Sequence, residues 1–354
     1  VSWRAADLAR NEATRTATAT AGRYANMVRL ELETALNAAN TLAQAQSGQL
    51  ASGESVSRTA CDAQLRSVLA GHEGFYGVWT GFEPDALDGR DAEFAGREGY
   101  DASGRYIPYF YRSNGSIARD VLVGYDQPGD GDYYLISRDS GREAVLDPFA
   151  YEVDGRPVLM TSLTAPVRRD GRVVGVTGVD MTLDMLHDLV ADIRIGQSGK
   201  LTIVAGDLSV VAHPDPARAG RPFAESAPWI ARHQSDTSAG RPFATWADAA
   251  SGEHCLHVVS PVSLGESGQT WYAVASLPEN EVLAEARRIA TLAVIVGLVG
   301  VALLVAVVFV IARGIAGPVG RVASELGTGA DQVRSASSQV ATSSQQDRKS
   351  TRLN

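Results

Sequence analysis

The longest uncharged stretch of the chain runs from Ile289 to Ala312, as IATLAVIVGLVGVALLVAVVFVIA. As a helix, these 24 residues would extend about 36 Å, which exceeds the ~30 Å hydrocarbon core of a bilayer. A buried helix of a globular protein rarely runs this far without a polar residue, so we predict a membrane-spanning helix over residues 289–312. Arginines flank both ends of the stretch, so the positive-inside rule does not determine its orientation.

A large region of the 354-residue chain precedes this stretch and a short tail follows it. The composition, 45% hydrophobic and 21% charged, is typical of a packed core and excludes a wholly disordered chain. A net charge of −9 without a run of basic residues argues against nucleic acid as a partner. Cys61 and Cys255 are too few for a disulfide framework or a thiolate metal site, and whether they pair is left open. We expect no metal and no cofactor.

The tail after the apolar stretch carries a seven-residue repeat in two rows offset by four positions. One row is Val322, Gly329, Ala336 and Ser343, and the other is Leu326, Val333 and Val340. We predict that residues 313–346 begin a helical coiled coil, the alternative being a polar disordered tail rich in Ser and Gln. Residues 347–354 break the repeat, and we expect them to be a non-native ending.

The start of the chain favours helix. Residues 1–56 are rich in Ala, Leu, Arg, Glu and Thr and contain no Pro, so we predict one long helix that ends near Gly48 to Glu54. The chain begins inside this pattern and without Met, so we expect that a preceding segment is missing. A second helix is predicted at residues 57–70.

Strand-forming residues follow in two groups. We predict strands at residues 75–82, 105–112, 144–153, 158–167 and 173–180, and then at 200–204, 206–211, 254–261 and 270–275. Turns at Asp154-Gly155 and Asp170-Gly171 join three of these strands into an antiparallel meander. Helices are expected at 183–193 and 279–288. The chain is therefore predicted to be α+β, with two modules in tandem at residues 57–195 and 196–288.

Several short segments occur together in this order. They are Gly89–Asp91, Gly104–Tyr109, Asp132–Tyr134, Leu146–Phe149, Val158–Ser162, Gly171–Val176 and Gly178–Asp180, followed by Gly199–Ile203 and Val211–Pro214. In combination they resemble the double Cache sensor domain of bacterial chemoreceptors, the methyl-accepting chemotaxis proteins, over about residues 1–288. Residues 323–346 are similar to the start of a chemoreceptor signalling helix. Ile315–Val319 is similar to the entry of a HAMP module, although a full HAMP module does not fit.

The resemblance implies a fold and a location. It implies two PAS-like Cache modules with antiparallel sheets, of which the first is membrane-distal and binds the ligand. It also implies a homodimer formed through the long first helix, with the sensor in the periplasm and the apolar helix in the inner membrane. The partners it implies are a small-molecule ligand, a cytoplasmic adaptor and a histidine kinase. The first membrane span and most of the signalling domain would then be missing from this chain.

The first module is unusually rich in aromatic residues. Nine of the chain's 11 tyrosines lie between residues 75 and 151. About half of these rings are expected to fill the core, but a Tyr hydroxyl is awkward to bury and common in ligand pockets. Tyr109 and Tyr111 share one face of a predicted strand. Tyr133 and Tyr134 follow a Pro- and Gly-rich loop that could form a lid, and Asp180 ends an apolar strand, where a carboxylate needs a partner.

The resemblance bears on the ligand. In double Cache sensors of amino acids, an aspartate at a strand end holds the ligand amine, and Asp180 matches it. An Arg followed by Trp-Tyr holds the ligand carboxylate in those sensors, but here Gly131–Tyr134 lacks both Arg and Trp. The usual second aspartate falls near Tyr151. A carboxylate among aromatic rings suits a cation, so we expect an amine or quaternary ammonium ligand; amino acids and purines are the alternatives. The predicted site residues are Trp79, Tyr109, Tyr111, Asp132, Tyr134, Asp147, Tyr151 and Asp180.

Enzyme motifs are weak in this sequence. Gly196–Lys200 is half of a phosphate loop, without its first Gly and its final Ser or Thr. His254, Cys255 and His257 lie close together but are too few for a metal site. We therefore expect no enzyme activity. One alternative to a chemoreceptor is the sensor part of a membrane histidine kinase or of a cyclic-dinucleotide synthase, and the sequence after residue 346 would distinguish these. Another alternative is a solute-binding protein, but the apolar stretch argues against it.

Overall fold

The computed structural model describes residues 2–53, 55–223, 227–249 and 251–350. Residues 3–285 form one compact unit, and the segment from residue 286 onward belongs to a second unit. The end of the segment for which we expect a non-native sequence, residues 351–354, lies outside the described residues.

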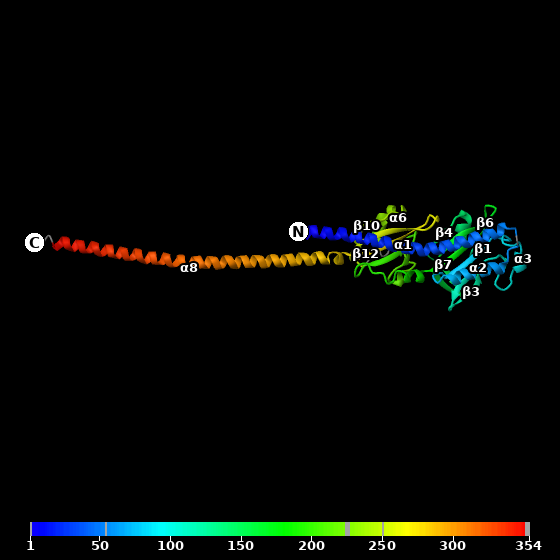
Figure 1. The fold of residues 1–354 in the computed structure, drawn as a ribbon, viewed down its shortest axis with the longest axis horizontal. Coiled ribbons are helices and arrows are strands. Elements are labelled where there is room, and N and C mark those ends of the chain that lie inside the picture. Colours follow the sequence, from blue (N-terminus) through cyan, green and yellow to red (C-terminus); the bar gives the residue numbers. More distant parts are fainter. Residues whose placement is uncertain (1, 54, 224–226, 250, 351–354) are drawn as a thin grey trace. The chain divides into compact units, whose positions relative to one another are not determined.

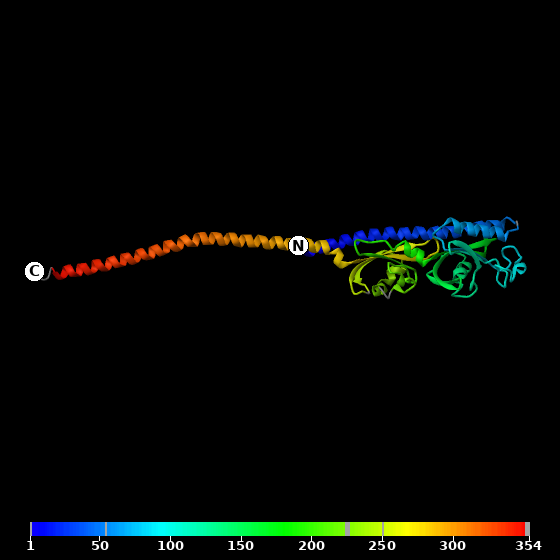
Figure 2. The same cartoon turned by 90° about the horizontal axis from the view of Figure 1, so that it is seen from below.

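The first helix, α1, spans Ser2–Ala51 and confirms the predicted long helix. Its buried face is made of small and aliphatic residues three or four positions apart, namely Ala17, Ala21, Ala25, Val28, Leu32, Ala35, Leu36, Ala39, Leu42 and Ala43. Figure 2 shows α1 lying along the same side of two sheets. The second helix, α2 (Arg58–Gly71), begins at Ser57, whose side chain accepts a hydrogen bond from the backbone N–H of Ala60. Such an N-cap satisfies a backbone donor that the helix itself leaves free.

The first sheet has seven strands in the order β3-β2-β1-β7-β6-β4, with β5 paired to β6. Their bounds are β1 Gly77–Phe82, β2 Pro108–Ser113, β3 Ser116–Val121, β4 Ala144–Val145, β5 Phe149–Val153, β6 Arg156–Arg169 and β7 Arg172–Thr182. Three short helices accompany them, α3 Asp91–Phe94, α4 Asp132–Ser140 and α5 Leu183–Asp188. The meander predicted from the two Asp-Gly turns is confirmed, because β5, β6 and β7 pair antiparallel in sequence.

The second sheet has five strands in the order β10-β11-β12-β8-β9. Their bounds are β8 Lys200–Val204, β9 Val210–Ala212, β10 Phe243–Asp248, β11 His254–Ser263 and β12 Thr270–Pro278. Short helical segments lie at η1 Pro216–Arg218, η3 Pro228–His233, α6 Gln234–Ser238 and α7 Glu279–Val282. Figure 1 shows both sheets in the compact unit.

The two sheets share a strand order. In each, the first strand pairs with the last strand, and the last strand pairs with the one before it: β1-β7-β6 and β8-β12-β11. One face of both sheets packs into a common core with α1 and α2. The opposite face of each sheet carries its own cluster, which is rich in Tyr in the first sheet and centred on Trp229 in the second. Each sheet therefore has an outer face that could hold a ligand independently.

Some predicted elements are corrected by the structure. The strand predicted at 144–153 is two strands, β4 and β5, because the chain breaks pairing around Asp147-Pro148 and a proline cannot donate to a ladder. Tyr133 and Tyr134, which follow the Pro- and Gly-rich loop, lie in helix α4, and no helix was predicted there. The helix predicted at 183–193 ends at Asp188. Strands β3 and β10 were not predicted, and both carry mixed polar and partly exposed residues without clear alternation.

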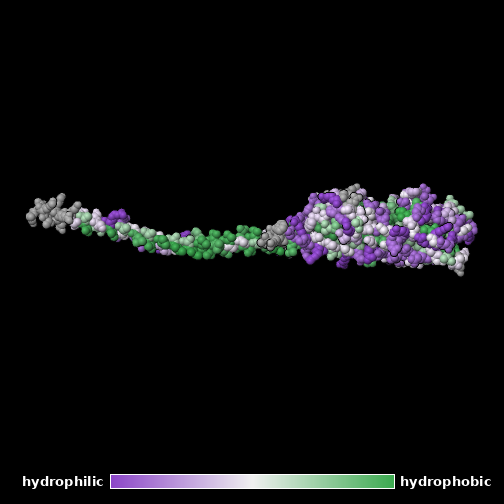
Figure 3. All heavy atoms as spheres, turned by 90° about the horizontal axis from the view of Figure 1, so that it is seen from above, coloured by the Kyte–Doolittle hydropathy of each residue, from purple (hydrophilic) through white to green (hydrophobic). Residues whose placement is uncertain are grey.

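Helix α8 spans Ala284–Ser350 and contains Pro318. The helix predicted at 279–288 is interrupted at Leu283, between α7 and α8. From Arg287 onward α8 is long and apolar enough to cross a membrane, and its large apolar side chains are exposed. Figure 3 shows a long hydrophobic stretch on the visible face of this helix. Together, α1, the antiparallel sheets and the apolar α8 confirm the predicted α+β class.

Candidate functional site

A row of four residues crosses the outer face of the first sheet. Gly77 in β1 lies opposite both Tyr111 in β2 and Asp180 in β7, and Asp180 lies opposite Ser162 in β6. Residues directly opposite each other in antiparallel strands point to the same face of the sheet. The sheet therefore places a carboxylate between a hydroxyl on one side and aromatic rings on the other.

Asp180 is 3% exposed. Its Oδ1 accepts hydrogen bonds from Trp79 Nε1 at 3.0 Å and from Ser162 Oγ at 2.5 Å. Burial raises the pKa of this carboxyl to about 6, although the bonds from Ser162 and Trp79 lower it. Among the ion pairs of the described residues, none involves Asp180. A buried carboxylate without a cation is unfavourable unless something supplies the positive charge.

Aromatic rings surround this carboxylate. The rings of Tyr109 and Tyr111 stack at 5.2 Å, and Tyr151 meets Tyr109 edge-on at 5.6 Å. Tyr133 of α4 contacts the rings of both Trp79 and Tyr151 edge-on. The hydroxyl of Tyr109 is buried beside Asp180 and lowers the pKa of that carboxyl, although the two groups are not aligned as a regular hydrogen bond. Burial and the charge of Asp180 raise the pKa of Tyr109 well above its usual value, so this hydroxyl stays protonated.

Two glycines make room for the rings. A Cβ on Gly77 would lie 2.5 Å from the ring of Tyr109, and a Cβ on Gly178 would lie 2.3 Å from the ring of Trp79. Side chains at these positions would collide with the rings, because real Cβ atoms do not approach this closely. The glycines thus allow Tyr109 and Trp79 to lie flat over the neighbouring strand beside Asp180.

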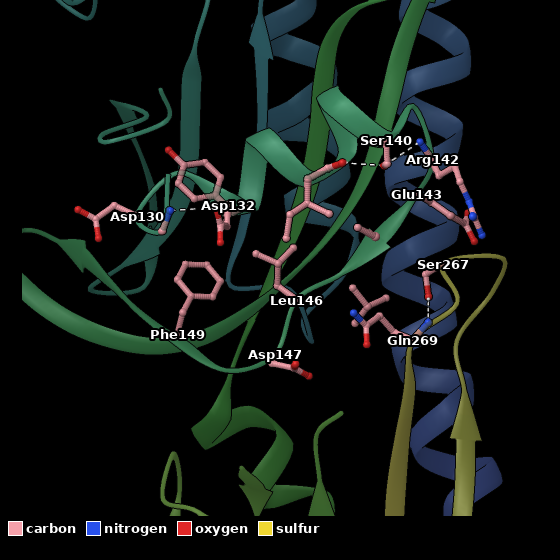
Figure 4. A pocket seen from close by; sticks show the side chains of 15 residues that line it. Asp130, Asp132, Ser140, Arg142, Glu143, Leu146, Asp147, Phe149, Ser267 and Gln269 are labelled. Carbon is pink, nitrogen blue, oxygen red and sulfur yellow. Dashed lines mark hydrogen bonds between the residues drawn. The ribbon is translucent and has the colours of Figure 1, made fainter. Parts of the chain in front are cut away.

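A cavity of about 350 Å³ adjoins this aromatic cluster, and Tyr133 and Phe149 belong to both. Figure 4 shows it between Asp130, Asp132 and Phe149 on one side and the side chains of Ser267 and Gln269 on the other. The charged residues that line it are Asp130, Asp132, Arg142, Glu143 and Asp147. The excess of carboxylates favours a positively charged solute in this cavity.

The cavity wall also joins the two sheets. Asp147 Oδ1 accepts a hydrogen bond from the backbone N–H of Gly206 at 2.9 Å. Glu143 accepts from Asn40 Nδ2 at 2.6 Å and from the backbone N–H of Glu266. Burial and the neighbouring charge of Asp207 raise the pKa of Asp147. The segment between α4 and β5 therefore contacts the cavity and the second sheet at once.

The structure places the predicted site residues in three groups. Trp79, Tyr109, Tyr111, Tyr151 and Asp180 come together in the aromatic cluster. Asp132 and Asp147 line the adjoining cavity instead. Tyr134 belongs to the same buried cluster, but its hydroxyl donates to Glu83 Oε1 and its ring packs near Tyr125.

Sequence reasoning missed three members of the site. Ser162 bonds Asp180 directly, and Tyr133 and Phe149 stand between the cluster and the cavity. The position of Ser162 follows only from the register of β6 against β7, which the sequence does not provide. The sequence places Tyr133 after a Pro- and Gly-rich loop but does not distinguish it from Tyr134, because the two faces of α4 cannot be assigned before the helix is known.

The segments considered for other chemistry have structural roles. The loop that is similar to half of a phosphate loop binds a carboxylate of the same chain: Glu281 accepts from the backbone N–H of Gln197 at 2.5 Å and of Ser198 at 2.9 Å. Within the described part of the chain, no group of His, Cys, Asp and Glu could hold a metal ion. Cys61 and Cys255 are both free and buried.

Comparison with known proteins agrees with this architecture. The Cache domain model matches residues 5–286. The methyl-accepting chemotaxis protein TlpQ of Pseudomonas aeruginosa is 33% identical over 138 residues, which cover 36% of this chain and 19% of TlpQ. PctB, a methyl-accepting chemotaxis protein of the same species, is 24% identical over 186 residues, which cover 52% of this chain and 28% of PctB. The chain thus matches less than a third of the length of these relatives.

Solved structures extend the similarity to the whole sensor. Methyl-accepting chemotaxis protein X is 25% identical, with a TM-score of 0.63, over 78% of this chain and 99% of that one. The extracellular domain of mmHK1S-Z2, described as a histidine kinase, is 26% identical, with a TM-score of 0.65, over 78% of this chain and 99% of that one. Because the Cache model matches most of its length, this chain belongs to the Cache domain family and is homologous to methyl-accepting chemotaxis proteins of Pseudomonas.

Proposed function

We propose that this chain is the sensor and membrane part of a chemoreceptor whose first sheet binds a small amine or quaternary ammonium compound. The observation that carries the proposal is Asp180, a buried carboxylate that contacts aromatic rings and, among the described residues, no cation. A cation over an aromatic face gains about 0.5–2 kcal/mol, and several rings together form a cage. The ammonium would pair with Asp180 and pack against Trp79, Tyr109 and Tyr151.

Entry of the ligand requires the aromatic cluster to open. The backbone of Val123 holds two of its rings: the N–H donates to the Tyr151 hydroxyl at 3.0 Å, and the C=O accepts from the Tyr133 hydroxyl at 2.8 Å. Val123 itself is half-exposed. Tyr133 and Tyr151 are both bonded to the backbone of Val123, so these bonds must change when the two rings separate. We infer that the loop containing Val123 and helix α4 move together to admit the ligand.

Signal transfer follows from a difference in ligand affinity between two arrangements of the sensor. We propose residues 57–195 as the ligand-binding module, residues 196–288 as the membrane-proximal module and residues 313–346 as the start of a cytoplasmic signalling helix. In this proposal the sensor is periplasmic, residues 289–312 cross the inner membrane, and α1 forms a homodimer. An adaptor and a histidine kinase would then read the signal.

The test is ligand binding to the whole chain in detergent micelles. Isothermal titration with choline and tetramethylammonium should show saturable binding, and with ligand at 100 times Kd the chain should be stabilised by about 2.7 kcal/mol. The variant Asp180→Asn should weaken binding by about 30-fold or more, because a buried charge pair loses one partner.

The matched control for this test is Asp184→Asn, which removes an exposed carboxylate four residues further along the chain. It should leave the affinity for both amines unchanged. Unchanged affinity in Asp180→Asn would reject the assignment. Binding of amino acids but of neither amine would mean that another residue holds a ligand carboxylate and that the cage is misassigned.

A histidine kinase is the second candidate for the output. It is favoured by the similarity to mmHK1S-Z2 over nearly the whole of that domain. The sensor would work in the same way in both cases. The sequence that follows residue 346 in the genome distinguishes them, because a kinase shows a His-bearing dimerisation helix and a chemoreceptor continues the Ser- and Gln-rich heptads.

A further inference from the structure

The outer face of the second sheet contains a cavity of about 610 Å³. Its wall includes Lys200 and Thr202 from β8, Cys255 and His257 from β11, and Ser276 from β12. None of the residues that line this cavity belongs to the aromatic cluster of the first sheet or to the cavity beside that cluster.

The position of this cavity corresponds to that of Asp180 in the first sheet. Asp180 stands two residues before Thr182, the N-cap of the helix that follows the last strand, and Ser276 stands two residues before Pro278, the N-cap of α7. Both lie in the last strand of their sheet, between the first strand and the last but one. The same backbone position is therefore presented to a cavity in each sheet.

The neighbours of this position differ in charge between the sheets. Asp180 lies opposite Gly77 and Ser162, whereas Ser276 lies opposite Lys200 and His257. The first sheet offers a carboxylate at this row, and the second sheet offers an ammonium, an imidazole and a hydroxyl on one face. Side chains directly opposite each other across antiparallel strands have Cβ atoms about 4.5–5.5 Å apart. Lys200 and His257 therefore flank Ser276 on either side, and a ligand above Ser276 can contact both.

His257 is built into the sheet, and one of its ring nitrogens has no well-aligned partner among the described residues. It is 3% exposed, and its ring stacks on Trp229 at 4.5 Å. Its Nδ1 is 2.8 Å from Ser276 Oγ, while Nε2 is buried and makes no hydrogen bond of good geometry with the described residues. Burial lowers the pKa of His257 to about 4, although an interaction with the backbone of Ala247 raises it, so the ring is neutral. When the Ser276 hydroxyl donates to Nδ1, Nε2 carries the hydrogen and can donate it to a ligand.

The charges around the cavity favour an anion at this row. None of the ion pairs found in the described ranges includes Lys200. Of the two acidic residues in the wall, Asp215 is engaged with the backbone N–H of Ala217 and with Arg218 at 3.9 Å, and Glu253 is exposed. No ion pair of the described residues therefore neutralises the ammonium of Lys200.

We propose that this cavity is a second ligand site, which binds a small carboxylate between Lys200, Ser276 and His257. The ammonium of Lys200 pairs with the carboxylate, and the N–H of His257 Nε2 donates to one of its oxygens. This site does not depend on the amine site, because the two share no residue. Pro278 and Asn280 also line the cavity, so an anion bound there contacts the segment that continues into α7.

Titration of the whole chain in detergent micelles with sodium acetate and sodium propionate tests the proposal, with sodium chloride as the control for ionic strength. Saturable binding in the millimolar range or tighter is expected. Lys200→Gln should weaken it by about tenfold or more, because a charge-assisted hydrogen bond is lost. Lys200→Arg should retain part of the affinity. Arg194→Gln, which removes an exposed charge six residues earlier, is the matched control and should have no effect.

Chemical labelling gives an independent measurement, since the chain has two lysines, Lys200 and Lys349. Acetate or propionate should slow the reaction of Lys200 with an amine-reactive ester, measured by peptide mass spectrometry, and should leave the reaction of Lys349 unchanged. Absence of saturable binding, binding that Lys200→Gln leaves intact, or equal reactivity of Lys200 with and without the anion would each overturn the proposal. These outcomes leave the amine site untouched, so failure of one proposal is distinguishable from failure of the other.

Discussion

The ionised form of Asp180, which prevails at neutral pH, lowers the free energy of unfolding. Its pKa is about 6 in the fold against an ordinary value of 3.8. A carboxyl whose pKa is raised on folding destabilises the fold above the raised pKa by about 3 kcal/mol for a two-unit shift, and this penalty disappears as pH falls toward the ordinary value. We expect Asp180→Asn to raise the midpoint of thermal unfolding at pH 7.5 and to have little effect near pH 4. A variant that unfolds earlier than the wild type at pH 7.5 would contradict this.

The same carboxyl makes amine binding depend on pH. A cationic ligand pairs with the ionised form, so protons compete with it below the pKa of about 6. The dissociation constant of tetramethylammonium, whose own charge does not titrate, should be constant above about pH 7 and rise about tenfold for each unit below the pKa. Titration calorimetry between pH 5 and pH 8 checks this; a flat profile would show that Asp180 does not pair with the ligand.

How far the site follows from sequence depends on the residue. Strand alternation is enough to put Tyr109 and Tyr111 on one face, and an aspartate at the end of an apolar strand is recognisable at Asp180. Ser162 and the two glycines beneath the rings are invisible to this reasoning, because they follow from register between strands far apart in the chain. The bond from the Tyr134 hydroxyl to Glu83 is likewise invisible in the sequence, because it depends on the position of Tyr134 on α4.

At the scale of the strand, the Trp79 ring packs so closely over the backbone of β7 that position 178 requires glycine. Gly178→Ala should displace Trp79 from Asp180 and destabilise the fold by about 1–3 kcal/mol, as overpacking of a filled core does. Gly74→Ala is the matched control, because a Cβ there would meet nothing within 4 Å. Equal unfolding midpoints for the two variants would show that the Trp79 ring can move without loss.

The loop before β8 is fixed to α7 by a single carboxylate. Burial alone would raise the pKa of Glu281, but bonds from the backbone of Gln197 and from Ser198 lower it. Glu281→Gln keeps the size of the side chain and removes its charge, so it should weaken this attachment by about 1 kcal/mol or more. Faster amide hydrogen exchange at Gln197 and Ser198, with unchanged exchange in β6 and β7, is expected. Unchanged exchange at the two amides would mean that the loop holds its conformation without Glu281.

Most elements could be predicted from their pattern, and the exceptions have physical reasons. The long α1, the N-capped α2 and the meander of β5 to β7 have strong signals in periodicity, capping and turn residues. Strand β3 has exposed positions and no clear alternation, so its place in the sheet depends on pairing with β2. Strand β10 is likewise defined by its neighbour β11. Local sequence does not specify such strands, because tertiary pairing overrides weak propensity.

For the molecule as a whole, residues 289–312 are expected to anchor the chain in a membrane. The chain should stay in the membrane fraction after extraction at alkaline pH. Leu303→Arg with Val307→Arg should release it, because each arginine at the centre of a span costs about 2.5–3.5 kcal/mol on insertion. The same exchange at Leu326 and Val333, outside the predicted span, is the matched control and should leave the chain in the membrane fraction. Release of both double variants, or of neither, would contradict the assignment.

The shared strand order of the two sheets also bears on how such a chain can change over generations. The chain contains two sheets of the same strand order, each with its own outer face. Mutations at position 180 or 276 can therefore accumulate in one sheet without disturbing the other, because the effects of distant mutations on stability add independently. Descendants of one ancestor can therefore diverge in what one half recognises while the other half and the shared core with α1 stay the same. Relatives of this chain should accordingly differ at these two positions in uncorrelated ways.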